Sequence, residues 1–316
     1  MMTYLMLVGG FVLLFVGGEA LVRGAVALAR RLGVSPLVIG LTIVAAGTSA
    51  PELVVSLQAA LRGQPDIAVG NVVGSNIANI LLILGTAGLI QSMRASPGLV
   101  YRDGGIMVGA SLLLVAVALT GQVAQWQGGI MFAGLIAYIV YSYWAEKRGT
   151  KPDFHSQEAE EFEAVPMKLP VAVLVLILGL GGVMLGADWL INGAVTIARQ
   201  FGVSEAVIGL TVVAIGTSLP ELATSVIAAF RRHADVAIGN VIGSNIFNIL
   251  GILGVTALVT PVPVNPSIVA FDIWVMLGVS VLLLPLLVTG WRLARAEAAL
   301  FFVAYVAYVG WLYLSG

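Results

Sequence analysis

Apolar residues form long, nearly continuous stretches in this chain, and short polar breaks separate them. We count ten such stretches, each close to the roughly 20 residues that an α-helix needs to cross a bilayer. They cover residues 3–28, 34–61, 67–91, 104–121, 127–145, 169–197, 203–230, 236–260, 268–289 and 295–314. The pattern predicts an all-α integral membrane protein with ten transmembrane helices.

The composition supports a membrane protein and excludes several other classes. Of the 316 residues, 59% are hydrophobic and 10% are charged, whereas soluble domains carry about 25% charged residues. The net charge of −1 gives no indication of a nucleic-acid partner. The chain has no cysteine, which excludes disulfides and thiol chemistry. The first apolar stretch lacks a basic start and a small-residue cleavage site, so we expect a retained helix.

The chain contains an internal repeat at a fixed offset of 169 residues. Residues 33–53 match 202–222 at 16 of 21 positions, and 70–85 match 239–254 at 13 of 16. We therefore expect a first repeat at 1–145, a charged linker at 146–168 and a second repeat at 169–316. Five spans in each repeat would insert the second one upside down. Inverted repeats of this kind, with broken core helices around a site at the midplane, build secondary transporters.

Basic residues are distributed unevenly between alternate loops. If the N-terminus is outside, thirteen Lys and Arg residues fall on the inner side and two, Arg62 and Arg199, on the outer side. Cytoplasmic loops carry an excess of Lys and Arg. We therefore predict that both termini are extracytoplasmic and that the linker is cytoplasmic. The expected location is a prokaryotic plasma (inner) membrane.

The most polar part of a predicted span is residues 47–53 (GTSAPEL), which residues 216–222 (GTSLPEL) repeat. A carboxylate inside a span marks an ion or proton path by default. Pro51 cannot donate to the carbonyl four residues back, which frees backbone oxygens beside Glu52. Thr48 lies one helical turn from Glu52. A group of oxygens with one negative charge suits a hard cation.

A second polar motif follows each of these, at residues 70–79 (GNVVGSNIAN) and 239–248 (GNVIGSNIFN). Ser75 and Asn79 are four apart and share a helix face, as do Ser244 and Asn248. We expect these four side chains to face an ion. The other four amides are predicted to join helices by hydrogen bonds, which are common in membranes. They are Asn71, Asn76, Asn240 and Asn245.

Together the paired motifs resemble the alpha repeats of the cation/calcium antiporter superfamily, specifically the sodium/calcium exchangers. The resemblance covers nearly the whole chain. It implies an antiporter, not an enzyme, that exchanges Ca²⁺ for Na⁺ by alternating access, with helices one and six sliding across the other eight. It implies no cofactor, and the expected partners are Ca²⁺, Na⁺ and membrane lipid, with no protein partner.

The resemblance also implies a set of cation ligands. Glu52 and Glu221 would be the central carboxylates, and Thr48 and Thr217 would supply backbone carbonyls to Ca²⁺. The other implied ligands are Ser49, Ser218, Ser75, Ser244, Asn79, Asn248 and the carbonyls of Ala45 and Ala214.

Asparagine at positions 79 and 248 departs from many members of this family, which carry aspartate at one or both positions. Only Glu52 and Glu221 then charge the core. Two carboxylates balance one Ca²⁺, whereas three Na⁺ leave one positive charge over, so we expect electrogenic exchange. Potassium dependence is not expected, because the potassium-dependent branch resembles the aspartate-bearing pattern.

Three other functions are compatible with buried polar residues. A cation/proton exchanger is the main alternative, with Glu52 or Glu221 protonated for part of the cycle. An intramembrane hydrolase would need a nucleophile–base pair or two catalytic aspartates. No histidine lies in a predicted span, and no aspartate pair faces the glutamates. A channel is the third, although a pseudo-symmetric site with two carboxylates suits a closed cycle better than a continuous pore.

Overall fold

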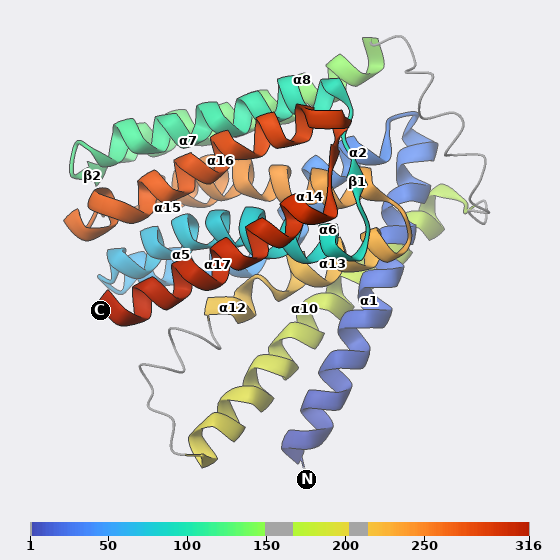
Figure 1. Cartoon of the computed structure of the whole chain (residues 1–316), viewed down its shortest axis with the longest axis horizontal. Helices are drawn as coiled ribbons and strands as arrows, with labels where there is room; N and C mark the ends of the chain where they lie inside the picture. Colours follow the sequence, from blue (N-terminus) through green and yellow to red (C-terminus); the bar gives the residue numbers. More distant parts are fainter. Residues whose placement is uncertain (1, 149–166, 202–213, 316) are drawn as a thin grey trace.

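The computed structural model describes residues 2–148, 167–201 and 214–315. Within these ranges the regular structure is helical apart from four strands of two residues each (Figure 1). The predicted all-α class is therefore confirmed. Most of the predicted linker 146–168 and the start of the predicted span 203–230 lie outside the described residues.

The described elements occur in the same order in both halves of the chain, except that η7 of the second half has no counterpart in the first. Those of the first half are α1 (Met2–Leu32), α2 (Pro36–Ile39), η1 (Gly40–Val44), α3 (Ala45–Thr48), α4 (Ala50–Leu61), α5 (Pro65–Ala78), η2 (Asn79–Leu84), α6 (Gly85–Ile90), β1 (Met93–Arg94), η3 (Leu99–Gly104), α7 (Gly105–Ala118), β2 (Gln122–Val123) and α8 (Gln125–Arg148). Those of the second half are α10 (Leu169–Gln200), α12 (Ala214–Thr217), α13 (Leu219–Phe230), α14 (Ala234–Ile246), η5 (Phe247–Leu253), α15 (Gly254–Val259), β3 (Val262–Pro263), η6 (Ile268–Asp272), α16 (Ile273–Val288), η7 (Thr289–Trp291), β4 (Arg292–Leu293) and α17 (Arg295–Ser315).

Membrane-spanning length is reached by eight helices in the described part of the chain, or nine if one bent pair is counted as a span. The bent pair is Pro36–Thr48 and Ala50–Leu61, which meet at 44°. Leu219–Phe230 is apolar but shorter, and the predicted span that contains it begins outside the described residues. The structure thus shows an integral membrane protein with a broken core helix, and the full set of ten spans stays a prediction.

The middle of the bundle is formed by two continuous spans, Pro65–Ile90 and Ala234–Val259. Their apolar windows are 72% and 83% buried, whereas the other candidate spans are between 11% and 50% buried. Each span contains a π-helical turn, η2 in the first and η5 in the second. Such turns inside α-helices occur frequently at functional sites. The polar motifs at residues 70–79 and 239–248 therefore lie in the two best-shielded spans of the protein.

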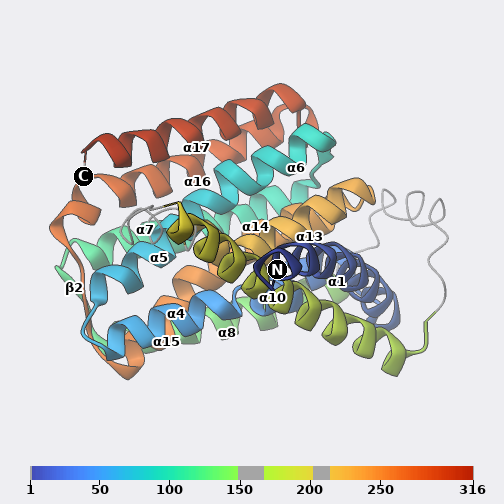
Figure 2. The ribbon, with the colours of Figure 1, turned by 90° about the horizontal axis from the view of Figure 1, so that it is seen from below.

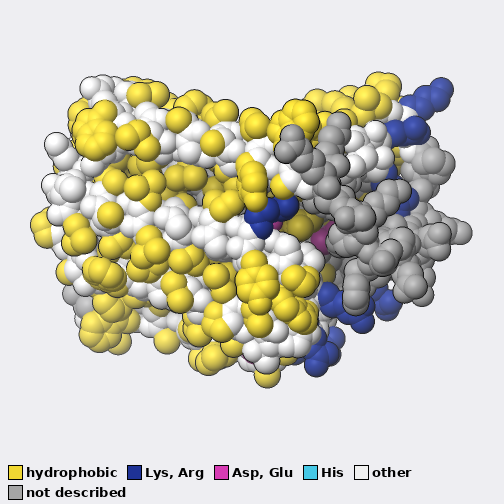
Figure 3. Space-filling view, turned by 90° about the horizontal axis from the view of Figure 1, so that it is seen from above, with side chains coloured by type: hydrophobic (Ala, Val, Ile, Leu, Met, Phe, Trp, Pro, Cys, Tyr) yellow, Lys and Arg dark blue, Asp and Glu magenta, His cyan; other side chains and the backbone are white. Residues whose placement is uncertain are grey.

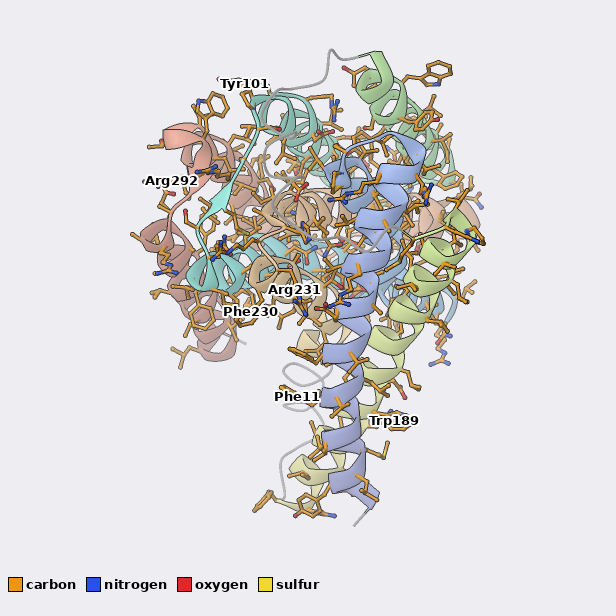
Figure 4. The ribbon with its side chains drawn as sticks, turned by 90° about the vertical axis from the view of Figure 1, so that its right-hand side faces the viewer. Phe11, Tyr101, Trp189, Phe230, Arg231 and Arg292 are labelled. Atoms are coloured by element: carbon orange, nitrogen blue, oxygen red, sulfur yellow. The ribbon has the colours of Figure 1, made fainter. Side chains whose placement is uncertain are left out.

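The long helices α1 and α10 lie side by side and cross the remaining helices obliquely (Figures 1 and 2). Glycines make this contact possible. A Cβ atom on Gly24 would lie 2.6 Å from the backbone nitrogen of Leu176, and one on Gly179 would lie 2.3 Å from that of Leu21. Small residues let membrane helices approach this closely. Part of the pair, with Phe11 and Trp189, projects beyond the bundle (Figure 4).

Two short antiparallel strand pairs join the halves at opposite ends of the bundle. β1 pairs with β4 and β2 pairs with β3. At the β1/β4 end, Arg31 Nε donates to the Met167 carbonyl at 2.7 Å. At the β2/β3 end, Asn265 Nδ2 donates to Asp66 Oδ2 at 2.9 Å. Each contact joins loops that the distribution of basic residues assigns to the same side of the membrane.

Hydrophobic side chains cover most of the face seen in Figure 3, and Lys and Arg gather towards one end of it. Large apolar residues are exposed on many helices, for example Trp126 at 68% and Phe11 at 68%. An apolar belt with basic residues towards one end is the surface expected of a protein embedded in lipid.

Candidate functional site

Both glutamates lie at helix breaks that the local sequence creates. The helical path is interrupted at Ser49 (φ −83°, ψ 7°) and at Ser218 (φ −88°, ψ 5°). A proline follows within the first two positions of α4 and of α13, where its missing N–H removes no helical hydrogen bond. Glu52 and Glu221 then fall in the first turn. The positive end of the helix dipole favours a carboxylate at this position.

Each glutamate contacts the other half of the chain. Ser49 Oγ donates to Glu221 Oε1 at 2.8 Å, and the Ser218 hydroxyl hydrogen-bonds the Glu52 carboxylate. Ser49 Oγ also lies 3.1 Å from Ser244 Oγ on α14. Glu52 and Glu221 are only 2% and 1% exposed. The two helix breaks are therefore linked crosswise in the interior of the protein.

Two asparagines attach the glutamate-bearing helices to the central spans. Asn71 Nδ2 donates to the Glu52 carbonyl at 3.1 Å and to Ser56 Oγ at 2.9 Å. Asn240 makes the equivalent contacts to the Glu221 carbonyl at 3.5 Å and to Ser225 Oγ at 3.2 Å. The prediction that these two amides join helices is confirmed.

Asn79 and Asn248 occupy the π-helical turns of the central spans. Asn79 is the first residue of η2 and Asn248 is the second residue of η5. The Asn79 amide nitrogen donates to Asn245 Oδ1 at 2.9 Å, and the Asn248 amide nitrogen donates to Asn76 Oδ1 at 3.4 Å. Both bonds again run between the halves of the chain.

Ten of the residues that the sequence singles out as ligands are buried, although Thr48 and Thr217 are predicted to act through their backbone carbonyls. We call these ten residues the polar cluster; each has a repeat mate 169 positions away. They are Thr48, Ser49, Glu52, Ser75, Asn79, Thr217, Ser218, Glu221, Ser244 and Asn248. The two remaining predicted ligands would act through backbone carbonyls: Ala45 begins α3 and Ala214 begins α12. The Ala45 carbonyl already accepts the Ser49 N–H at 3.0 Å.

Four oxygens of the polar cluster are buried without a hydrogen-bond partner among the described residues. They are Glu52 Oε2, Glu221 Oε2, Asn79 Oδ1 and Asn248 Oδ1. A buried polar atom left unpaired costs about 1–3 kcal/mol, so four of them at related positions require an explanation such as an ion. Two carboxylates surrounded by neutral oxygens suit a cation that prefers oxygen ligands, as Ca²⁺ does.

The chemistry of the cluster is restricted to oxygen ligands. No group of three or more His, Cys, Asp or Glu side chains that could hold a metal occurs in the part of the chain that the structure describes. Glu52 and Glu221 are the two acidic residues of the polar cluster, and its other members are neutral. The formal charge of the cluster comes from these two glutamates.

Sequence reasoning overlooked two acid–tyrosine contacts, one buried and one partly buried. Tyr138 Oη donates to Asp103 Oδ1 at 3.3 Å, and Tyr308 Oη donates to Asp272 Oδ1 at 2.8 Å. Asp103 also pairs with Arg102 at 2.9 Å. These contacts tie α8 to η3 and α17 to η6. The repeat offset aligns Asp103 with Asp272 and was a usable signal, but the two tyrosines are out of register by one residue.

Comparisons with known proteins give one consistent result. A family model described as sodium/calcium exchanger protein matches residues 2–144 and 171–314. The chain is 34% identical to the sodium/calcium exchanger MaX1 of Methanosarcina acetivorans, over 97% of each chain. It is 37% identical to the inner membrane protein YrbG of Escherichia coli, over 88% of this chain and 86% of that protein. A solved structure of the sodium-calcium exchanger NCX_Mj, soaked with 10 mM Na⁺ and zero Ca²⁺, superposes with a TM-score of 0.84 at 30% identity and 98% coverage of each chain.

Proposed function

The chain belongs to the sodium/calcium exchanger family, and on that premise we propose that it exchanges Ca²⁺ for Na⁺ across a membrane by alternating access. The observation that carries the proposal is the set of four unpartnered oxygens of Glu52, Glu221, Asn79 and Asn248. They lie in the shielded middle of the bundle, where a bound cation would compensate all four oxygens.

In this proposal Glu52 and Glu221 are the central ligands of Ca²⁺, and the side-chain oxygens of Asn79 and Asn248 are further ligands. Ca²⁺ takes six to eight oxygens at about 2.3–2.6 Å in flexible geometry. Carbonyls of Thr48 and Thr217 would supply further oxygens. The serines of the cluster, with the carbonyls of Ala45 and Ala214, would serve Na⁺.

The charge of the site provides a reason for obligatory exchange. Two unpaired carboxylates in a low-dielectric interior are strongly unfavourable. The conformational change with an empty site is therefore disfavoured, whereas one Ca²⁺ neutralises the pair. If three Na⁺ replace one Ca²⁺, one positive charge is left over, which makes the exchange electrogenic.

The proposed architecture is two inverted repeats of five helices, at 1–145 and 169–316, joined by the linker 146–168. It is supported by the strand pairs and loop contacts, which connect loops assigned to the same side. The moving part is the α1/α10 pair, because it makes close backbone contact within itself and crosses the bundle as a unit.

Purified protein in liposomes tests the proposed exchange directly. Ca²⁺ uptake driven by an outward Na⁺ gradient is expected, with little effect of varying K⁺ or Mg²⁺. Uptake that needs no Na⁺ and follows an imposed pH gradient would support the cation/proton exchanger instead. Flux that neither saturates nor needs a counter-ion would indicate a channel.

We further propose that the protein lies in a prokaryotic inner membrane with both termini outside. The location is supported by the similarity to an inner membrane protein of Escherichia coli. The orientation is supported by thirteen basic residues on one side against two on the other. A protease-cleavable tag after Gly316 should be removed by external protease from intact spheroplasts. Cleavage only after lysis would reverse the orientation.

A further inference from the structure

Asn76 and Asn245 are repeat mates outside the predicted ligand set, yet each contacts a ligand of the opposite half. Asn76 lies on α5 and Asn245 on α14, and both are 1% exposed. Asn245 Oδ1 accepts from the Asn79 amide at 2.9 Å, and Asn76 Oδ1 accepts from the Asn248 amide at 3.4 Å. The two contacts are related by the same offset of 169 residues.

The orientation of these outer amides is fixed by groups that only accept. The Asn245 amide nitrogen faces the backbone carbonyl of Asn76 at 3.4 Å and the sulfur of Met107 at 3.6 Å. The Asn76 amide nitrogen faces the sulfur of Met276 at 3.7 Å. Carbonyl and thioether groups have no proton to donate. Turning either outer amide over would set oxygen against oxygen or sulfur, so the oxygen must face the inner asparagine.

This orientation determines what the inner asparagines present to the cluster. An amide has two donors at one end and an acceptor at the other. Because Asn79 and Asn248 direct their nitrogens to the outer amides, their oxygens remain available, and these are the unpartnered Asn79 Oδ1 and Asn248 Oδ1. The reverse orientation would point two N–H groups at a cation.

We propose that Asn76 and Asn245 are positioning residues that turn the amide oxygens of Asn79 and Asn248 towards the transported cation. The inference rests on the proposed cation site in the polar cluster. Met107 and Met276 act one step further out, since their sulfur atoms help to hold the outer amides. Asparagine has only one side-chain oxygen, so it must be oriented to serve as a neutral ligand. A carboxylate at the same position would present an oxygen in either orientation.

The test measures, in liposomes, the Ca²⁺ concentration that half-saturates Na⁺-driven uptake by Asn245→Leu and by the wild type. Loss of a residue that orients a metal ligand typically lowers metal affinity about 10–100-fold. We therefore expect Asn245→Leu to raise the half-saturating Ca²⁺ concentration at least about 10-fold. Asn76→Leu should act in the same direction through Asn248. Met131→Leu, at a buried position on α8 outside the cluster, is the matched control and should leave the value unchanged.

The same substitution in an Asn79→Asp background separates positioning from packing. A carboxylate has oxygen at both ends, so Asn245→Leu should then change half-saturation by less than about 2-fold, because coupled residues are non-additive. If Asn245→Leu raises the half-saturating Ca²⁺ concentration about 10-fold in both backgrounds, the proposal is overturned. A normal half-saturation value in folded Asn245→Leu would also overturn it.

Met107→Leu provides a second variant if Asn245→Leu does not fold. The change conserves volume, so Met107→Leu should still fold. Loss of the sulfur acceptor should raise half-saturating Ca²⁺ about 2–5-fold, the range of one weak hydrogen bond, and an unchanged value would contradict the proposal. If the wild-type protein performs no Na⁺-driven Ca²⁺ uptake, the proposed function itself fails.

Discussion

The two halves of the chain have nearly the same core sequence but differ in the ion pairs of Glu19. Glu19 on α1 pairs with Arg23 and accepts from Arg231 Nε, which lies in the loop after α13, at 2.6 Å. Figure 4 shows Arg231 beside α1. The repeat mates of Glu19 and Arg231 are Asp188 and Arg62. Asp188 instead accepts from Asn192 at 3.0 Å, and Arg62 has no ion pair among the described residues.

This difference indicates how a symmetric sequence can produce two states. The Glu19–Arg231 pair ties α1 to the bundle towards the β1/β4 end, while the equivalent groups at the other end are apart. If alternating access exchanges the conformations of the two repeats, Asp188 and Arg62 should meet in the opposite state. The single structure would then show one of two related arrangements.

The largest effect is expected where the halves should be equivalent, at the glutamates. Glu52→Gln and Glu221→Gln should each reduce Na⁺-driven Ca²⁺ uptake at least about 100-fold, because removing one member of a buried charge system costs about 3–5 kcal/mol. Uptake in liposomes at saturating wild-type Ca²⁺ is the measurement.

Glu297→Gln is the control, since its oxygen caps the backbone of Ala294 at 2.7 Å and glutamine can keep this contact. Normal uptake in one glutamate variant and loss in the other would show that the halves do not contribute equally.

The second effect concerns the contact between α1 and α10. Gly179→Ala places a Cβ 2.3 Å from the backbone nitrogen of Leu21, whereas Gly181→Ala on the same helix meets nothing within 4 Å. Overpacking typically costs about 1–3 kcal/mol. We expect a lower thermal unfolding temperature for Gly179→Ala only. Equal stability of the two variants would mean that α1 and α10 do not depend on this close approach.

A smaller effect is expected from the ion pair itself. Exposed ion pairs contribute about 0.2–1 kcal/mol. Arg231→Gln should therefore change the ratio of the arrangement seen here to the opposite arrangement by no more than about 5-fold. Arg62→Gln should change this ratio in the other direction. The chain has no cysteine, so single cysteines at the repeat mates Ser56 and Ser225 can report access by their labelling rates. Shifts of the same sign in both variants would exclude an exchange of ion pairs.

The smallest effect is a pH dependence of the folding stability, and it comes from a residue found only in the second half. Burial, opposed by Asp235 and reinforced by Arg30, lowers the pKa of His233 in the loop after α13. The folded state then binds fewer protons than the unfolded state, in which histidine has a pKa of about 6.5. This contribution to stability is therefore present above about pH 6.5 and is lost as the pH falls.

The repeat mate of His233 is Gln64, so His233→Gln makes the second loop resemble the first. Unfolding temperatures between pH 5 and 8 should depend less on pH in this variant. An unchanged profile would place the acid sensitivity elsewhere.

Local sequence was sufficient to predict the all-α membrane class and the places where core helices break. Pro51 and Pro220 prevent a regular helix through Ser49 and Ser218, and the structure has breaks at both serines. The buried positions of Glu52 and Glu221 followed from the apolar residues around them. These features depend on neighbours within a few residues, which a sequence pattern records.

Contacts between the halves were not predictable in the same way. The four-residue spacing of a helix assigned Asn76 to a different face from Asn79, which suggested a role only in joining helices. Its partner is Asn248 from the opposite half, and no local pattern indicates that pairing. The π-helical turn that begins at Asn79 also has no signal in the sequence.

The four short strands make each half of the chain depend on the other for completion. β1 follows the third span of its half and pairs with β4, which follows α16 of the other half, while β2 and β3 make the reciprocal pair. Two identical five-helix chains inserted in opposite orientations would pair their strands in this same way. The β1/β4 pair can therefore form only after α16 and β4 have been synthesised.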